Sequence, residues 1–442
     1  MNPGVSFLCF LLCIIIAGCD RVYVHPFYLT SLTNITNCKK VEELLENNSA
    51  PFRNKSEEWG KHPHQRYLKD PIHILGARFY KELRKTYKDE NILLSPTFSY
   101  ESLLSFFIGA SGKTALDLQT LLGFDPLSSD PNCTLRIDGH KVLSALSSII
   151  KNPFQSEEND KLFFSKISCL FSAPEIHVSK SFVHVLTSPH INFFVQAVDF
   201  TNLTQAAEQI NAFVEGKRTQ RSKSLLADID PETTLLFATY TQFKVFVKGA
   251  SPLKEPQEFW LNSDTKISVP MMTVTGTFQH KHESNVSIIK IPIGKDLFLL
   301  LSQPVNNSEL ASAEAQYSSI PSLEWLQNLS PRQIHLTLPM VSFESIYDLQ
   351  ELLGKLGLPG LLGKNANLRL LSDTNLTIGK IINQQLLELS PSGTDEVEDL
   401  TEKSQDIETL RITLNKPFLL AMYEESGALL YFGRITNPLE GT

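Results

Sequence analysis

Residues 109–114 (GASGKT) have the composition of a ligand-binding motif, because they resemble the end of a phosphate-binding loop. In such a loop, backbone amides and a lysine hold the phosphate groups. The loop also needs a glycine several residues before Gly112, and that position is Phe107. We therefore interpret the segment as a turn between two helices, with a Ser or Thr cap.

Pairs of histidines occur at residues 62–64 (HPH) and 280–283 (HKHE). A helical zinc site needs two histidines at positions i and i+4, so that both lie on one face of the helix. Neither pair has this spacing, and Pro63 would break a helix, so we interpret both as surface loops. The chain also has no G-x-S-x-G or C-x-x-C motif. We predict that the protein is not an enzyme and that it holds no metal or cofactor.

The N-terminus indicates export. Residues 5–16 form a nearly unbroken apolar run, followed by Ala17-Gly18-Cys19 and Asp20, which is typical of a signal peptide cleaved after Cys19. The run is too short to cross a bilayer comfortably, and no later segment is more apolar, so we expect no membrane anchor. The alternative is a bacterial lipidation site at Cys19, because residues 16–19 (IAGC) resemble a lipobox.

Asn-X-Ser/Thr tripeptides favour the eukaryotic secretory route over bacterial lipidation. We treat each as a candidate N-glycosylation site and expect a secreted, extracellular protein. The candidates are Asn34, Asn47, Asn54, Asn132, Asn202, Asn285, Asn306, Asn328 and Asn375.

The cysteines fit the same compartment. Of the six, three fall in the predicted signal peptide, which leaves Cys38, Cys133 and Cys169. An odd number outside the cell predicts one disulfide and one buried thiol, but the spacing does not say which two pair.

Charge and composition describe a soluble globular body with a polar tail. The formal net charge is −8, and Lys and Arg form only small clusters, so we expect no nucleic-acid partner. Residues 20–64 are polar and rich in Asn, and no linker interrupts the chain from about residue 71 onwards. We predict a signal peptide (1–19), a tail up to residue 65 and one body over 66–442.

Helices are predicted mostly early in the body and strands mostly late, which favours an α+β fold with largely antiparallel sheets. Ser95 and Pro96 predict a helix start, and another helix runs from about Thr114 to a stop at Gly123. Runs rich in β-branched and aromatic residues predict strands at 234–247, 334–343 and 418–423. The last continues through a Gly427 turn into 428–432, which predicts a hairpin.

Several segments resemble the serpin family, and they are spread over residues 66–442. They are 91–96 (NILLSP), 109–115 (GASGKTA), 269–272 (VPMM), 338–340 (LPM), 347–349 (YDL), 415–420 (NKPFLL) and 433–438 (GRITNP). The resemblance implies the α+β serpin fold, with three mainly antiparallel sheets and about eight or nine helices. It also implies an exposed reactive-centre loop near residues 393–410.

An inhibitory serpin is the main alternative function, and the loop hinge argues against it. In inhibitory members the cleaved loop enters the sheet as a new strand, so alternate side chains must enter the core. Here Gly393 and Thr394 fit, but if Thr394 points inward, Glu396 and Glu398 do too. A shift of one residue buries Asp395 and a further acid instead. Burying these carboxylates costs on the order of several kcal/mol each, so we predict a non-inhibitory member.

The first residues after the predicted signal peptide match a vasoactive octapeptide hormone, in the form with Val at its fifth position. Among serpins this match implies a hormone precursor. The matching residues are Asp20, Arg21, Val22, Tyr23, Val24, His25, Pro26 and Phe27.

The resemblance implies that renin, an aspartic protease, cuts Leu29–Thr30 and releases residues 20–29. A converting dipeptidase would then remove Tyr28 and Leu29, and residues 20–27 would act on receptors that regulate blood pressure and salt. Pro26 and the β-branched residues before it favour an extended backbone, which suits a protease cleft. Tyr28 departs from the His that is common in mammalian precursors, which leaves the matching renin undetermined.

The resemblance also implies a disulfide between Cys38 and Cys133, with Cys169 left as the buried thiol. Such a bridge would tie the tail to the body. A hormone-transport serpin is a third interpretation, but it does not explain residues 20–27.

Overall fold

The computed structural model describes residues 28–29, 67–124, 136–151, 162–187, 193–216, 229–230, 232–283, 285–294, 296–305, 310–319, 326–392 and 409–440. Contacts divide the chain into two units: residues 1–61 with 125–138, and residues 62–124 with 139–442. The described part of the smaller unit is one short ladder, and the larger unit contains all the remaining elements.

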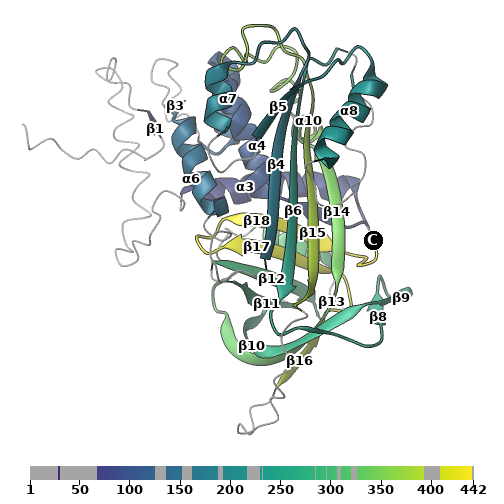
Figure 1. The fold of residues 1–442 in the computed structure, drawn as a ribbon. Helices are drawn as coiled ribbons and strands as arrows, with labels where there is room; N and C mark the ends of the chain where they lie inside the picture. Colours follow the sequence, from purple (N-terminus) through teal and green to yellow (C-terminus); the bar gives the residue numbers. More distant parts are fainter. Residues whose placement is uncertain are drawn as a thin grey trace, which may run out of the picture. The chain divides into compact units, whose positions relative to one another are not determined.

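The described part of the larger unit contains eight helices (Figure 1). They are α3 (Lys69–Thr86), α4 (Pro96–Gly109), α5 (Gly112–Leu121), α6 (Gly139–Lys151), α7 (Lys180–Leu186), α8 (Leu203–Glu215), α9 (Leu310–Ser319) and α10 (Leu349–Lys355).

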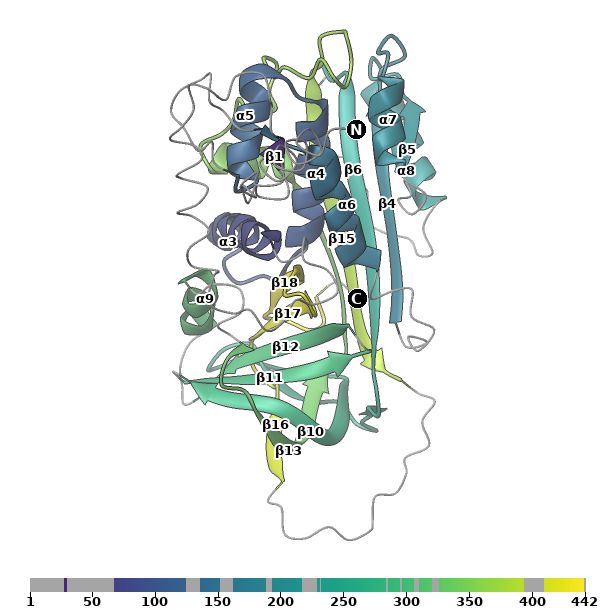
Figure 2. The ribbon, with the colours of Figure 1, turned by 90° about the vertical axis from the view of Figure 1, so that its left-hand side faces the viewer.

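A five-stranded sheet forms one layer of this unit, in the order β14-β15-β6-β4-β5. Its members are β14 (Val341–Asp348), β15 (Ile378–Pro391), β6 (Leu235–Val247), β4 (Leu162–Ser172) and β5 (Phe193–Ala197). The β15–β6 and β4–β5 pairs are parallel and the other two are antiparallel. Helix α8 covers one face of the sheet and α4 the other (Figure 2).

A nine-stranded sheet forms the second layer, in the order β16-β13-β10-β11-β12-β17-β18-β2, with β7 beside β10. Its strands are β16 (Leu410–Thr413), β13 (Ser330–Pro339), β10 (Met271–Glu283), β11 (Val286–Ile293), β12 (Leu297–Pro304), β17 (Phe418–Glu424), β18 (Leu429–Ile435), β2 (Ile92–Leu94) and β7 (Ser251–Pro252). A separate ladder joins β8 (Gln257–Trp260) to β9 (Lys266–Val269).

The nine-stranded sheet has two parts, because β10 changes partner along its length. Residues 271–280 pair with β13, whereas residues 279–283 pair with β11. Strand β10 is strongly curved where this change occurs (Figure 2). Together with the five-stranded sheet, the two parts make the three sheets of the predicted serpin fold, which is confirmed.

The predicted helix starts and stops are confirmed by their caps. Ser95 precedes α4, and its hydroxyl accepts a hydrogen bond from the Phe98 amide at 3.3 Å. Helix α5 ends before Gly123, whose φ of 84° is left-handed and therefore favours glycine. Gly427, with φ 94°, forms the turn between β17 and β18, as the hairpin pattern predicted.

The prediction of one strand over residues 334–343 is wrong. Strand β13 ends at Pro339, and β14 begins at Val341 in the other sheet. Alternate residues 334, 336 and 338 are buried in β13, but 341 and 343 are buried in β14. The alternation of buried and less buried residues therefore shifts by one where the chain crosses from one sheet to the other. The sequence analysis missed this shift because it treated residues 334–343 as one continuous strand.

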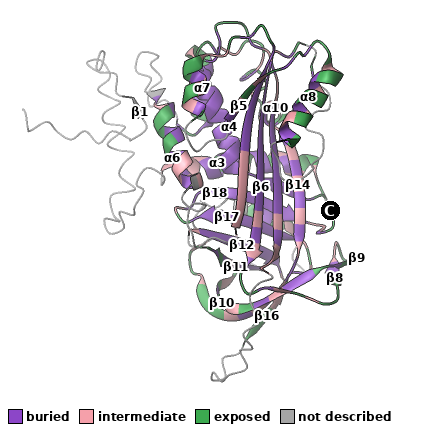
Figure 3. Ribbon diagram, viewed as in Figure 1, coloured by how far each residue is buried: buried purple, intermediate pink, exposed green. Residues whose placement is uncertain are grey.

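Helix α4 lies in the core between the two sheets. Every residue of α4 except Ile108 is buried, whereas α7 and α8 each expose one face (Figure 3). The Thr97 hydroxyl donates to the Leu429 carbonyl of β18, and the Ser102 hydroxyl contacts β15 and β6. A helix buried on all sides must satisfy its polar groups internally, so these bonds fix α4 to both sheets.

Candidate functional site

The predicted cleavage segment forms a strand. Strand β1 (Tyr28–Leu29) pairs antiparallel with β3 (Arg136–Ile137), with Tyr28 opposite Ile137 and Leu29 opposite Arg136. The predicted scissile bond therefore begins at the last residue of β1. Thr30, Cys19 and the predicted hormone residues 20–27 lie outside the described residues.

Strand β3 was missed by the sequence analysis. Ile137 is 2% exposed, and β3 leads within two residues into α6. A two-residue strand has too few side chains to show an alternating pattern, so no local signal could have located it. The pairing with β3 holds the backbone at Tyr28–Leu29, just before the predicted scissile bond, extended.

The two ends of the predicted reactive-centre loop lie in different sheets. Strand β15 ends at Pro391 in the five-stranded sheet, and β16 begins at Leu410 in the other. The expected loop range of 393–410 is therefore too long, because Leu410 is already in a strand. The predicted hinge residues Gly393, Thr394, Asp395, Glu396 and Glu398 lie outside the described residues.

The β6–β15 pair is closed along the whole distance to the loop. Its register runs without interruption from Phe237 opposite Ile381 to Val247 opposite Pro391. A new strand in the centre of this sheet would have to separate these two strands.

Side chains bridge the β6–β15 pair on both faces. On the α4 face, the Ser102 hydroxyl lies 3.1 Å from the side-chain amide of Asn383 and 3.4 Å from the hydroxyl of Thr239. On the other face, Lys244 of β6 forms an ion pair with its register partner Glu388 of β15, at 2.8 Å. The two strands are therefore joined by more than their backbone ladder.

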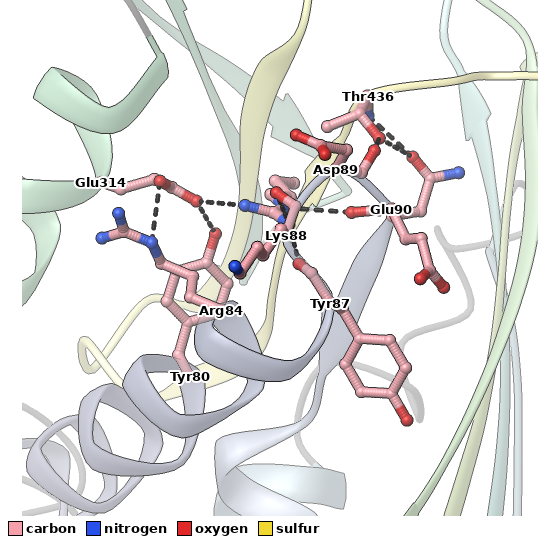
Figure 4. A network of polar contacts seen from close by, with 10 residues as sticks. Tyr80, Arg84, Tyr87, Lys88, Asp89, Glu90, Glu314 and Thr436 are labelled. Atoms are coloured by element: carbon pink, nitrogen blue, oxygen red, sulfur yellow. Dashed lines mark hydrogen bonds and ion pairs between the residues drawn. The ribbon is translucent and has the colours of Figure 1, made fainter.

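A buried carboxylate joins α9 to α3 and β18. Glu314 is 2% exposed, and the Tyr80 hydroxyl donates to it at 2.7 Å (Figure 4). The nitrogens of Arg84 and Arg434 lie 3.0 Å and 3.2 Å from its oxygens. Burial, and then the charge of Glu314, raise the pKa of Tyr80 well above its ordinary value, so Tyr80 remains a donor. This network pairs a buried charge with several partners.

Arg434 also binds the turn between α3 and β2. Its Nε donates to the Glu90 carbonyl at 3.0 Å, and its Nη2 donates to the carbonyls of Lys88, at 2.6 Å, and Tyr87 (Figure 4). Arg434 belongs to the C-terminal GRITNP motif, but nothing in the sequence identified Glu314 as its partner.

The phosphate-loop motif is a helix–helix turn, as predicted. Residues 109–114 contain the end of α4 and the start of α5. The expected Ser cap is wrong, because the Ser111 side chain makes no capping hydrogen bond. Instead the Ser111 amide donates to the Asn367 carbonyl at 2.8 Å, and the Thr114 hydroxyl accepts from the Asn367 amide at 2.9 Å. Asn367 therefore occupies one backbone amide and the Thr114 hydroxyl in this turn.

The interpretation of residues 280–283 as a loop is wrong, because they end strand β10. The ring Nε2 of His280 lies 3.0 Å from the Ser287 hydroxyl. Burial lowers the pKa of His280, and nearby His282 and Arg332 lower it further. In the part of the chain that the structure describes, no group of three or more His, Cys, Asp or Glu side chains could hold a metal ion. His62 and His64 lie outside that part.

Cys169 is buried on β4, as predicted, while Cys38 and Cys133 lie outside the described residues. Four of the predicted glycosylation sites are described, and all four asparagines are exposed: Asn202, Asn285, Asn328 and Asn375. Sites Asn34, Asn47, Asn54, Asn132 and Asn306 fall outside. None of the described helices is both long and apolar enough to cross a membrane.

Comparison with known proteins gives the family. A family model described as Serpin (serine protease inhibitor) matches residues 72–438. The chain belongs to the serpin family. Angiotensinogen of Bos taurus is 34% identical over 472 residues, covering 99% of this serpin and 98% of that protein. Angiotensinogen of Homo sapiens is 34% identical over 477 residues, with the same shares covered. This serpin therefore resembles angiotensinogens over its full length, including the N-terminal tail.

Solved structures confirm the fold of this serpin. The crystal structure of mouse protein Z-dependent protease inhibitor matches with a TM-score of 0.71 and 24% identity. The match covers 85% of this chain and 98% of the other. At that identity the likeness concerns the fold alone, so inhibition by the mouse protein says nothing about inhibition here.

Proposed function

We propose that this serpin is a secreted hormone precursor, and that renin releases Asp20–Leu29 by cleaving Leu29–Thr30. Residues 20–27 carry the proposal, because they match angiotensin with Val at its fifth position. They directly follow the predicted signal peptide in a chain that resembles angiotensinogens along 99% of its length. The body would carry the peptide, and the chain itself would catalyse no reaction.

The ladder between β1 and β3 holds the backbone before this bond extended, and a protease would have to displace β3 to bind it. Aspartic proteases bind substrates as extended strands, and Tyr28–Leu29 is already extended. After release, a converting dipeptidase would remove Tyr28 and Leu29. The octapeptide would then contact its receptors through Arg21, Tyr23, His25 and Phe27, the last with its new carboxylate.

A disulfide between Cys38 and Cys133 would control how the tail is presented. It would close a long loop and stabilise the fold by roughly 4–5 kcal/mol in the chain-entropy model. We expect Cys38→Ser to be cleaved by renin at a different rate from the wild type. Equal rates for the two proteins would show that the bridge has no role in presentation.

Two costs oppose loop insertion, and the acidic hinge is the one that favours a non-inhibitory serpin, because any inserting serpin must separate the strands that flank the new one. Entry of the loop would break the ladder, the Ser102 bonds and the Lys244–Glu388 ion pair. It would also bury the acidic hinge residues that follow Thr394. Both costs oppose insertion, which inhibition in this family requires.

The proposed function is tested by incubating the secreted full-length protein with renin of the same species and weighing the small products by mass spectrometry. We expect Asp20–Leu29 to be released while the rest of the chain stays intact. Leu29→Pro should abolish release and serves as the control for cleavage at this bond. An untouched tail, with a protease covalently attached near residues 393–410, would show instead that the protein is an inhibitor.

A further inference from the structure

Three buried side chains each have a polar atom without a hydrogen-bond partner in the part of the chain that the structure describes. These atoms are the hydroxyl of Thr241 on β6, the amide nitrogen of Gln385 on β15 and the hydroxyl of Tyr431 on β18. Each of the three residues is only 1% exposed. Buried polar groups normally bond to protein or to an ordered water, because an unbonded one opposes folding.

The three side chains meet between the β6–β15 pair and β18. Thr241 and Gln385 are direct partners in the parallel ladder, so both leave the same face of the sheet, from strands about 4.8 Å apart. Tyr431 approaches this face from β18, and its ring lies 5.7 Å from that of Phe243, two residues further along β6. Burial raises the pKa of Tyr431 and the Thr241 hydroxyl lowers it, which also places the two hydroxyls close together.

Neighbouring side chains hold Gln385 in place. The other end of its amide lies 3.1 Å from the Ser345 hydroxyl of β14. That hydroxyl also donates to the Leu93 carbonyl of β2 at 2.7 Å. The unbonded end of the amide is therefore fixed beside Thr241 by contacts with the rest of the core.

The charged side chains next to Thr241 neutralise each other. Lys166 of β4 is the partner of Thr241 in the antiparallel ladder, and it forms a buried ion pair with Glu101 of α4. A buried anion at the three polar atoms would need a cation of its own, and Lys166 already has a counter-ion. The site therefore suits a small neutral molecule that both donates and accepts hydrogen bonds.

We propose that one water molecule is bound here and joins Thr241, Gln385 and Tyr431. A buried water typically makes about three hydrogen bonds, which matches the three polar atoms. The water would connect β6 and β15 of one sheet to β18 of the other. Separating β6 from β15 would break this bridge, so the water would add to the closure of the strand pair. The proposal concerns the body alone and does not depend on cleavage by renin.

The site is tested by a high-resolution crystal structure of the secreted full-length protein, with and without a bromide soak. We expect a single density peak within hydrogen-bonding distance of Thr241 Oγ1, Tyr431 Oη and the Gln385 amide, and no anomalous signal from bromide at that peak. Absence of density would overturn the proposal. An anomalous peak would also overturn it, because the ligand would then be an anion.

The energetic role is tested with Thr241→Val and Tyr431→Phe, which remove one hydroxyl each with little change of shape. Losing one bond to the water should raise the unfolding equilibrium constant about fivefold in each variant, as measured by chemical denaturation. Tyr100→Phe is the matched control, because the Tyr100 hydroxyl donates directly to the Leu122 carbonyl at 2.9 Å. A lower unfolding constant for Tyr431→Phe would contradict the proposal, since removing an unbonded buried hydroxyl favours folding.

Discussion

The single carboxylate of Glu314 accepts from the Tyr80 hydroxyl and pairs with the guanidinium groups of Arg84 and Arg434. Replacing it with Gln leaves the charges of Arg434 and Arg84 without a counter-ion. Breaking a buried pair in this way costs about 3–5 kcal/mol, so we expect Glu314→Gln to lower the free energy of unfolding by that amount. Chemical denaturation measures it. Asp117→Asn, which removes an exposed ion pair with Lys113, is the control and should cost below about 0.5 kcal/mol. Equal losses would contradict a special role for Glu314.

His280 makes stability depend on pH. Its pKa in the folded protein is below the unfolded value of about 6.5, so the unfolded state binds the proton more readily. Stability contributed by neutral His280 is therefore lost as the pH falls through the unfolded pKa, and the loss levels off below the folded pKa. We expect His280→Gln to reduce the loss in melting temperature between about pH 7.5 and pH 5.5. His177→Gln, at an exposed site, should leave that loss unchanged. A His280→Gln profile identical to the wild type would contradict this cause.

At the scale of elements, the proposed cleavage would require the protease to displace β3 from the backbone of β1. Ile137→Pro should disrupt the two-residue strand β3 and free Tyr28–Leu29 for binding in the cleft. Because one hydrogen bond contributes about 1 kcal/mol, we expect renin kcat/KM to rise by at most about tenfold. Ile137→Val keeps the donor and is the matched control. A lower rate for Ile137→Pro would show that β3 assists cleavage by pre-forming the extended substrate.

The Lys244–Glu388 ion pair contributes to closure of the β6–β15 pair. Both side chains are about one-fifth exposed, at 22% and 19%, so solvent weakens their attraction. A double-mutant cycle with Lys244→Met and Glu388→Gln should give a coupling energy of about 1 kcal/mol. Denaturant unfolding of the four proteins measures it. A coupling energy near zero would show that the ion pair adds nothing to the closure of these two strands.

The sequence predicted helix ends well where they depend on neighbouring residues. It predicted features poorly where they depend on contacts with residues far along the chain. Ser95 and Gly123 marked helix ends because a cap and a left-handed glycine are local requirements. The Ser111 side chain does not cap α5, and the Ser111 amide instead donates to Asn367, which is distant in sequence. The sequence analysis also missed β3 and Glu314, because each interacts with partners far along the chain and leaves no local pattern.

At the scale of the whole molecule, family motifs identified the fold because they are distributed over the entire body. The predicted hormone segment was identified separately, by its match to a known peptide at the start of the mature chain. Only Tyr28 and Leu29 of that segment are described, so the structure adds their pairing with β3. Composition alone indicated neither the fold nor the hormone segment, because a charge of −8 and an ordinary apolar content fit many secreted proteins.

At the scale of the whole molecule, cleavage of the loop between β15 and β16 tests whether the cut loop can insert into the five-stranded sheet. An inserted strand would add a ladder on each side and raise the melting temperature strongly. Here insertion must separate β6 from β15, lose the Ser102 and Lys244 contacts, and bury Glu396 and Glu398 or their neighbours. We therefore expect protein cut within residues 393–408 to melt within about 2 °C of the intact protein in scanning calorimetry. An inhibitory serpin cut in its own loop is the control for detecting the rise. A rise of similar size in this protein would show that the hinge acids and the closed strand pair do not prevent insertion.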